Sequence, residues 1–185
     1  MLDVGCGGGR LTRTLAGRGT TVDALGADPA VIARARALTP ARLDVKHHAV
    51  RFEEARLDPR GYDAVTAVAA LHHMRLGPAL DRLAGAVAPG GTLLVLGLYR
   101  ETHPADLATS VAALGPQWFI GAGLRLGRST ARLPDLSAVP EAPMRMLDPV
   151  ETLPQIRAEV ARRLPGARVR RLLFWRFSLV WTRTG

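Results

Sequence analysis

The sequence contains few of the residues that build disulfide frameworks, membrane spans or RNA-binding surfaces. Cys6 is the only cysteine among 185 residues, which excludes an internal disulfide and fits a reducing, cytoplasmic environment. Aromatic residues make up only 5% of the chain, so no aromatic-rich RNA-binding pattern is present. Residues 107–124 carry no charged side chain, but Pro116, Gln117 and several glycines interrupt them, and we expect no membrane span.

Lysine is also scarce, although the formal net charge is +9. Lys46 is the one lysine among 25 basic residues, and the arginines are spread along the whole chain. Only residues 162–163 and 168–176 concentrate them locally. With abundant alanine, glycine and proline, this skew is typical of genome composition rather than of selection for phosphate contacts. It argues against a nucleic-acid partner.

The remaining composition and the apolar pattern predict one α/β domain. A hydrophobic fraction of 48% and a charged fraction of 22% are those of an ordinary globular protein. Apolar runs typical of strands alternate with segments of helical spacing. The predicted strands are 2–4, 22–27, 43–50, 62–69 and 92–98, and the predicted helices are 10–18, 30–38 and 78–87. This alternation predicts a Rossmann-like, doubly wound, mainly parallel sheet in a three-layer α/β/α arrangement.

The last part of the chain departs from this rhythm. Residues 100–165 contain eight prolines and few strand signals, and we expect them to form a lid insertion over a substrate. Residues 169–174 and 177–182 have strand character and a tight connection, which predicts a C-terminal antiparallel hairpin. Because no internal repeat is apparent, we expect residues 1–185 to form a single domain.

The strongest signal for a ligand site is the segment Leu2-Asp3-Val4-Gly5-Cys6-Gly7-Gly8-Gly9, between the first strand and the first helix. Glycines there leave backbone N–H groups free and let a ligand approach the main chain closely. A nicotinamide fingerprint needs a glycine where Arg10 stands, so the spacing disfavours a dehydrogenase. The loop alone is equally explained by a turn without a ligand.

Asp28 strengthens the case for a ligand. It follows Gly9 by 19 residues and ends the second predicted strand. A carboxylate at that point can accept both hydroxyl hydrogens of a ribose, because the first two strands are neighbours. Its position before Pro29 is also typical of a helix-capping residue, and the two roles are compatible.

Five motifs occur in a characteristic order along residues 1–99. They are Asp3-Val4-Gly5-Cys6-Gly7-Gly8-Gly9, Asp28, Tyr62-Asp63-Ala64-Val65, Ala70-Leu71-His72-His73 and Pro89-Gly90-Gly91-Thr92. This order resembles that of the class I S-adenosylmethionine-dependent methyltransferases, and the C-terminal hairpin resembles the last two strands of that family. The combined pattern is specific for the superfamily but not for a substrate.

The resemblance implies that the chain binds S-adenosylmethionine. Gly5 and Gly7 would lie against its methionine portion, and Asp3 would orient the loop and the methionine amino group. Ala69 and Leu71 would line the floor near the sulfonium. The residues implied at the cofactor are Asp3, Gly5, Gly7, Gly9, Asp28 at the ribose, Val50 at the adenine, Ala69 and Leu71.

The sequence departs from the family pattern at two places. Family members usually carry an acidic residue just after the third strand, which bonds the adenine amino group. Here Ala49-Val50-Arg51 occupies that region, so either Glu53 or Glu54 substitutes or this hydrogen bond is absent. Family members also usually carry helices before the glycine loop, whereas here the central strand begins at Met1. We therefore expect a fragment or a misassigned start.

His72 and His73 are the candidate catalytic residues, because substrate and cofactor meet after the fourth strand in this fold. An imidazole accepts a proton from an attacking hydroxyl or amine near neutral pH. The alternative is that one histidine caps the strand end and the other packs against the cofactor. His47 and His48 are adjacent on a strand and point to opposite faces, so we predict no metal site there.

The predicted reaction is methyl transfer from S-adenosylmethionine to a small acceptor. Trp118, Phe119 and Ile120 lie within the uncharged part of the expected lid and indicate a partly apolar molecule. The alternative is a cofactor-binding or catalytically degenerate partner subunit, because the adenine-side acid is missing.

Overall fold

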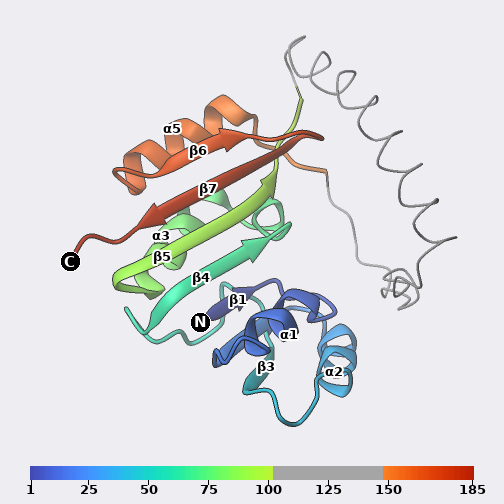
Figure 1. Ribbon diagram of the computed structural model, residues 1–185. Coiled ribbons are helices and arrows are strands. Elements are labelled where there is room, and N and C mark those ends of the chain that lie inside the picture. The colour runs from blue at the N-terminus through green and yellow to red at the C-terminus, as the bar shows by residue number, and fades with distance from the viewer. Residues whose placement is uncertain (102–147) are drawn as a thin grey trace, which may run out of the picture.

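The computed structural model describes residues 1–101 and 148–185, which form a sheet flanked by helices (Figure 1). The strands are β1 (Leu2–Val4), β2 (Val22–Gly26), β3 (Val45–Ala49), β4 (Tyr62–Val68), β5 (Val87–Leu98), β6 (Arg168–Arg171) and β7 (Arg176–Thr182). The helices are α1 (Arg10–Ala16), α2 (Pro29–Ala37), the short 3-10 helix η1 (Leu71–His73), α3 (Leu76–Ala86) and α5 (Leu153–Arg163). All elements predicted for the first hundred residues are present, and apart from the start of β5 their ends shift by two residues at most.

The sheet has the order β3-β2-β1-β4-β5-β7-β6. Neighbours among β1 to β5 are parallel, and β7 is antiparallel to both β5 and β6. The predicted doubly wound, mainly parallel sheet with a C-terminal hairpin is therefore confirmed. The strand order reverses at β1, which lies between β2 and β4. The loops after β1, β2 and β4 consequently meet at the carboxyl edge, where ligands bind in such sheets.

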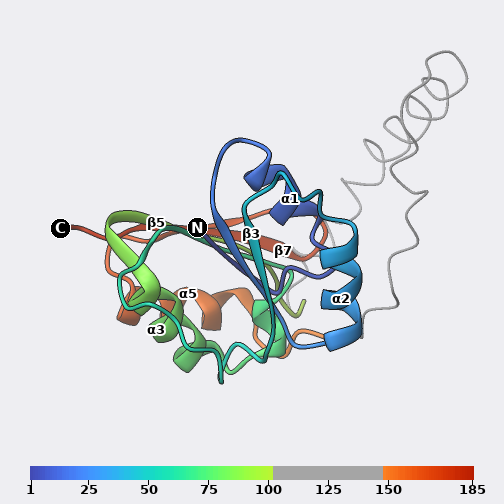
Figure 2. The same cartoon turned by 90° about the horizontal axis from the view of Figure 1, so that it is seen from below.

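Helices cover both faces of the sheet. Figure 2 shows α1 on one face and α3 with α5 on the opposite face. The α2 helix lies beside the start of α1. A Cβ built on Gly9, which precedes α1, would be 3.2 Å from the Cβ of Ala35 in α2. Pro29 is in the first turn of α2, where its missing N–H costs no intrahelical hydrogen bond.

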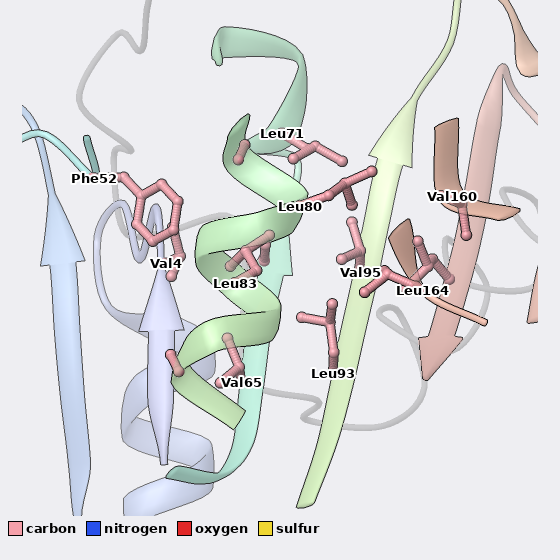
Figure 3. Close-up of a cluster of buried hydrophobic side chains, with 14 of the residues drawn as sticks. Val4, Phe52, Val65, Leu71, Leu80, Leu83, Leu93, Val95, Val160 and Leu164 are labelled. Atoms are coloured by element: carbon pink, nitrogen blue, oxygen red, sulfur yellow. The ribbon is translucent and has the colours of Figure 1, made fainter. Parts of the chain in front are cut away.

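The main core lies between the sheet and the pair α3 and α5 (Figure 3). Leu80 and Leu83 of α3 are fully buried, as are Val65 and Leu93 of the sheet. Burying one such side chain contributes roughly 1.5–3 kcal/mol. This packing fixes β5 and its neighbour β4, and the end of β4 carries part of the site described below.

The start of β5 differs from the prediction. The strand begins at Val87, so Pro89-Gly90-Gly91 lies within it rather than in a preceding turn. Tyr62 pairs with Val87, and the register shifts before the next pair on β4. The residue after β7 also holds this part of β5 in place: the Gly90 N–H donates to the Arg183 carbonyl at 2.9 Å. The three residues therefore form an irregularity inside a continuous strand.

Most of the lid insertion expected at residues 100–165 lies outside the described residues, and the structure describes only residues 100–101 and 148–165 of it. Residues 153–163 form α5, whose Leu153, Ile156 and Val160 are buried in the core. Because its apolar residues follow helical spacing, the helix has one apolar face, and the burial of that face in the core makes α5 part of the domain. Trp118, Phe119, Ile120 and the uncharged stretch 107–124 lie outside the described residues. Among the helices that the structure describes, none is long and apolar enough to cross a membrane.

Candidate functional site

The loop after β1 adopts a conformation that requires glycine. Gly5 has a φ of +74°, and its N–H donates to the Leu25 carbonyl at 2.9 Å. A Cβ built on Gly5 would lie only 2.4 Å from the Cβ of Ala70, which follows β4. Gly7 and Gly9 also have positive φ values, +50° and +75°. The loop therefore presents main-chain atoms at the carboxyl edge of the sheet.

The Asp3 side chain fixes the start of this loop through hydrogen bonds to two neighbouring elements. It is buried, and its two oxygens accept hydrogen bonds from the hydroxyls of Thr12, at 2.6 Å, and Thr66, at 3.0 Å. Burial raises the pKa of the Asp3 carboxyl, and the two hydroxyl hydrogen bonds oppose that rise. Asp3 thus ties β1 to α1 and β4, and its oxygens are engaged within the protein.

Asp28 caps α2 and faces the same edge. Its Oδ1 accepts hydrogen bonds from the N–H groups of Ala30, at 2.8 Å, and Val31, at 3.3 Å. The predicted capping role is therefore confirmed. No hydrogen bond from residues 1–101 or 148–185 uses Oδ2, which leaves this oxygen able to accept from a ligand hydroxyl.

The segment after β3 is held in place by α3. Val50 N–H donates to the Gly26 carbonyl at 2.9 Å, which brings this segment to the end of β2. Arg82 donates from Nε to the Phe52 carbonyl at 2.9 Å and lies over the Phe52 ring, 5.5 Å from its centre. Arg51 and Glu53 are both exposed, with 3.9 Å between Nε and Oε2. Arg51 thus places an exposed cation in the segment 49–51, where the resemblance led us to expect an acid.

The end of β4 turns sharply toward the glycine loop. Ala69 has a φ of +51°, although it is not glycine, and its N–H donates to the Leu96 carbonyl at 2.7 Å. Such a conformation costs roughly 1–3 kcal/mol and persists only where the surroundings enforce it. It directs Ala70 against Gly5 and leads into η1, which carries the two candidate histidines.

His72 and His73 lie together in η1, with ring centres 4.0 Å apart. Burial lowers the pKa of His72, and a charge on His73 lowers it further. The Nδ1 atom of His72 is buried and has no hydrogen-bond partner among residues 1–101 and 148–185. His72 is therefore neutral at pH 7 with one ring nitrogen unused.

One cavity joins these loops. Its volume of about 720 Å³ lies within the range of small-molecule and cofactor pockets. The residues that line it come from the ends of β1, β2, β3 and β4. They are Gly5, Gly7, Leu25, Gly26, Ala27, Asp28, Pro29, Val31, Ile32, Val50, Arg51, Phe52, Glu53, Ala69, Ala70, His73 and Met74.

The cavity contains some of the residues predicted from the sequence and not others. Gly5, Gly7, Asp28, Val50, Ala69 and His73 line it. Four predicted residues do not: Asp3 is buried beneath the loop, Gly9 begins α1, Leu71 belongs to the core and His72 packs beside His73. Glu53 lines the cavity and Glu54 does not, so only Glu53 is placed to act on the adenine side.

Sequence reasoning missed Gly26 and Met74 as lining residues. A Cβ on Gly26 would lie 2.7 Å from Cδ1 of Ile32, so a side chain there would force the Ile32 side chain of α2 to move. The spacing Gly26-Ala27-Asp28, with a glycine two residues before the acid, is a signal that the sequence analysis did not use. No sequence signal marks Met74 as a lining residue. It follows η1 directly, so its position depends on where that short helix ends.

Cys6 adds no nucleophile to the site. Burial raises the pKa of its thiol to about 12, and the nearby negative charge of Asp3 acts in the same direction. The thiol lies 3.8 Å from the Gly7 carbonyl. It remains protonated at neutral pH, and a protonated thiol is unreactive.

The sequence is similar to methyltransferases over its whole length. The family model for a methyltransferase domain matches residues 2–93. An uncharacterized methyltransferase of Mycobacterium tuberculosis is 34% identical over 182 residues, which cover 98% of this chain and 85% of that protein. The ubiquinone biosynthesis O-methyltransferase of Sodalis glossinidius is 37% identical over 104 residues, 55% of this chain and 42% of that protein.

Solved structures show the same fold. The magnesium protoporphyrin IX methyltransferase of Synechocystis, solved with bound SAH, has a TM-score of 0.61 at 17% identity and covers 99% of this chain and 73% of its own. A SAM-dependent methyltransferase of Aquifex aeolicus has a TM-score of 0.60 at 14% identity, over 98% and 80%. Together with the relative of 34% identity, these similarities show that the chain belongs to the class I S-adenosylmethionine-dependent methyltransferases, a superfamily of enzymes.

Proposed function

We propose that this chain binds S-adenosylmethionine in the cavity and transfers its methyl group to a small, partly apolar acceptor. The observation that carries the proposal is the convergence of Gly5, Gly7 and Asp28 on one cavity. Bare main chain and an available carboxylate oxygen suit a ligand with a charged amino-acid end and a ribose. The close approach of Ala70 to Gly5 supports this fit, because no side chain at Gly5 would leave the loop in place.

Each part of the cofactor has a candidate partner. Gly5 and Gly7 would hold the methionine portion, and Asp28 would accept from the ribose through Oδ2. Val50 would flank the adenine, with Glu53 as the nearest acid, and Ala69 would line the floor near the sulfonium. Asp3, Gly9 and Leu71 would act indirectly, because they position the loop and the end of β4.

His72 and His73 are the proposed proton acceptors. When bound, S-adenosylmethionine supplies a methyl group that is already activated for transfer. The protein then has to align the acceptor, exclude water and remove the acceptor's proton. His73 lines the cavity, and the neutral imidazole of His72 lies directly against it. We assign proton removal to this pair. The acceptor's lone pair would form the new bond to the methyl carbon while the bond from that carbon to the sulfonium breaks, and the sulfur would leave with that electron pair as a neutral thioether.

Asp28→Asn separates ribose binding from helix capping. Asparagine caps helices as well as aspartate does, so the free energy of unfolding should stay close to that of the wild type. Loss of the charged hydrogen bond should weaken S-adenosylmethionine binding by about 1–3 kcal/mol, measured by calorimetric titration. Asp28→Ala should lose the same affinity and also about 0.5–2 kcal/mol of stability.

Asp63→Asn is the matched control, because Asp63 is exposed and lies outside the cavity. Unchanged affinity in Asp28→Asn would leave Asp28 as a helix cap only. A folded wild-type protein that gives no binding heat would overturn the proposal. Binding of the cofactor without turnover of any acceptor would instead favour a catalytically degenerate partner subunit.

A further inference from the structure

The connection between β6 and β7 exposes a group of large apolar side chains. Leu172 is 38% exposed, and Leu173 and Trp175 are each 47% exposed. Figure 1 shows this connection at the end of the sheet, beside the end of β5. Tyr99 N–H donates to the Trp175 carbonyl at 2.9 Å, which fixes the connection to the residue that follows β5. We call Leu172, Leu173 and Trp175 the tip patch.

The backbone of the tip is unusual for the residues that it contains. Phe174 and Trp175 have φ values of +59° and +56°, in the left-handed region. Hairpin connections that need this region normally use glycine or asparagine, because bulky side chains are strained there. The Leu172 N–H donates to the Arg176 carbonyl at 2.8 Å, so the connection is closed and ordered. This turn is ordered although its backbone is strained, and it keeps the Trp175 indole exposed. Such strain is typical of functional sites, so we infer that the indole contacts a partner.

Arginines stand directly behind the tip patch. Arg168, Arg170 and Arg176 are all exposed. Arg170 pairs with Ser178, and Arg168 and Arg176 are each two residues from a member of that pair, so all three lie on one face of the hairpin. None of them forms an ion pair with any residue of 1–101 or 148–185. Within the described part of the chain, this face therefore presents three positive charges that no ion pair compensates.

We propose that the tip patch docks on an anionic phospholipid surface. Tryptophan and leucine partition into the boundary between headgroups and acyl chains, and nearby arginines bind the phosphates. The order of apolar and basic residues along the hairpin matches the order of acyl chains and phosphates across such a boundary. The apolar residues are at the end of the hairpin, and each arginine lies one to four residues from the nearest of them, roughly 3–14 Å at the rise of a strand. Two copies joined through this face would bring arginines against arginines, which disfavours self-association.

Docking would orient the cavity toward the lipid. β6 is parallel to β5, so the tip lies at the same carboxyl edge as the cavity. Two to three strand spacings separate β4 from β7 and β6, roughly 10–15 Å. An acceptor dissolved in the membrane would therefore meet the site without crossing much water. This last consequence rests on the proposed function, whereas the docking itself does not.

Sedimentation of the full chain with vesicles tests the proposal. Vesicles of phosphatidylglycerol and phosphatidylcholine should retain the wild type, whereas vesicles of phosphatidylcholine alone should not. Retention should fall as salt rises. The double variant L173S/W175S should bind about tenfold or more weakly, because two apolar side chains no longer insert. R170E/R176E should lose binding to a similar extent, through repulsion from the anionic surface.

The matched controls lie on α2, away from the tip. L38S removes a side chain that is 42% exposed, and R34E reverses an exposed arginine, and both should bind like the wild type. Thermal unfolding followed by circular dichroism checks that every variant is folded, independently of cofactor binding. Wild-type protein left in the supernatant with anionic vesicles would overturn the proposal. So would binding that R170E/R176E abolishes but L173S/W175S leaves intact, the result expected for a nucleic acid or another polyanion.

Discussion

Single residues shape this site mainly by what they allow the backbone to do. Gly5 lets the loop after β1 approach Ala70, and Ala69 accepts a strained φ so that Ala70 reaches that position. Asp3 contributes by fixing the loop from below rather than by lining the cavity. At this scale Asp28 and the two histidines are the residues proposed for the chemistry, and the other residues position them.

Gly5→Ala should destabilise the protein by about 1–3 kcal/mol, because the new Cβ meets Ala70 and the positive φ is strained. Gly8→Ala is the matched control, since a Cβ on Gly8 would have no atom within 4 Å. Its free energy of unfolding should stay within about 1 kcal/mol of the wild type. Urea unfolding measures both variants. Equal losses would show that the approach of Ala70 to Gly5 does not constrain the loop.

His72 should titrate below the ordinary histidine pKa of 6.5, because burial disfavours its charged form. Since its pKa is lowered in the folded state, the unfolded chain binds a proton more readily as the pH falls below 6.5. His72 therefore contributes stability above that pH, and the contribution disappears on acidification. A nuclear magnetic resonance titration of the His72 ring measures the pKa, and a midpoint above 6.5 would contradict the buried, unpartnered Nδ1.

At the scale of elements, α5 has a start signal in the local sequence that the many prolines around it obscure. Thr152 begins the helix, and both its N–H and its hydroxyl bond to the Gln155 side chain, at 2.8 and 2.9 Å. This spacing, followed by Ile156 and Val160 four residues apart, is a helix signature that can be read from the sequence. Eight prolines between 100 and 165 directed the interpretation toward an irregular insertion instead. Pro154 is in the first turn, where proline is tolerated.

Ile156→Ala should destabilise the protein by about 2–5 kcal/mol, because Ile156 is buried between α5 and the sheet and its loss leaves a cavity. Arg157→Ala, on the exposed side of the same helix, should change the free energy of unfolding by no more than about 0.5 kcal/mol. Chemical denaturation distinguishes the two. A loss under 1 kcal/mol for Ile156→Ala would mean that α5 is peripheral, as a lid insertion would be.

At the scale of the molecule, the strand order decides where the chemistry lies. Because β1 is flanked by β2 and β4, residues as far apart as 5, 28, 50 and 73 surround one cavity. The C-terminal hairpin completes the sheet and brings the tip patch to the same edge. The proposed cofactor site and the proposed docking surface therefore share one edge of the sheet, to which both ends of the chain contribute.

The sequence by itself determined the type of most elements, the glycine loop and the position of Asp28 at the end of β2. These are local properties, set by apolar spacing and by residues that permit or forbid particular backbone angles. Only the tertiary structure decided that Ala70 closes against Gly5, that Asp3 bonds to Thr12 and Thr66, and that Arg82 fixes Phe52. Such contacts join residues many positions apart, so they depend on strand order and register, which no short stretch of sequence encodes.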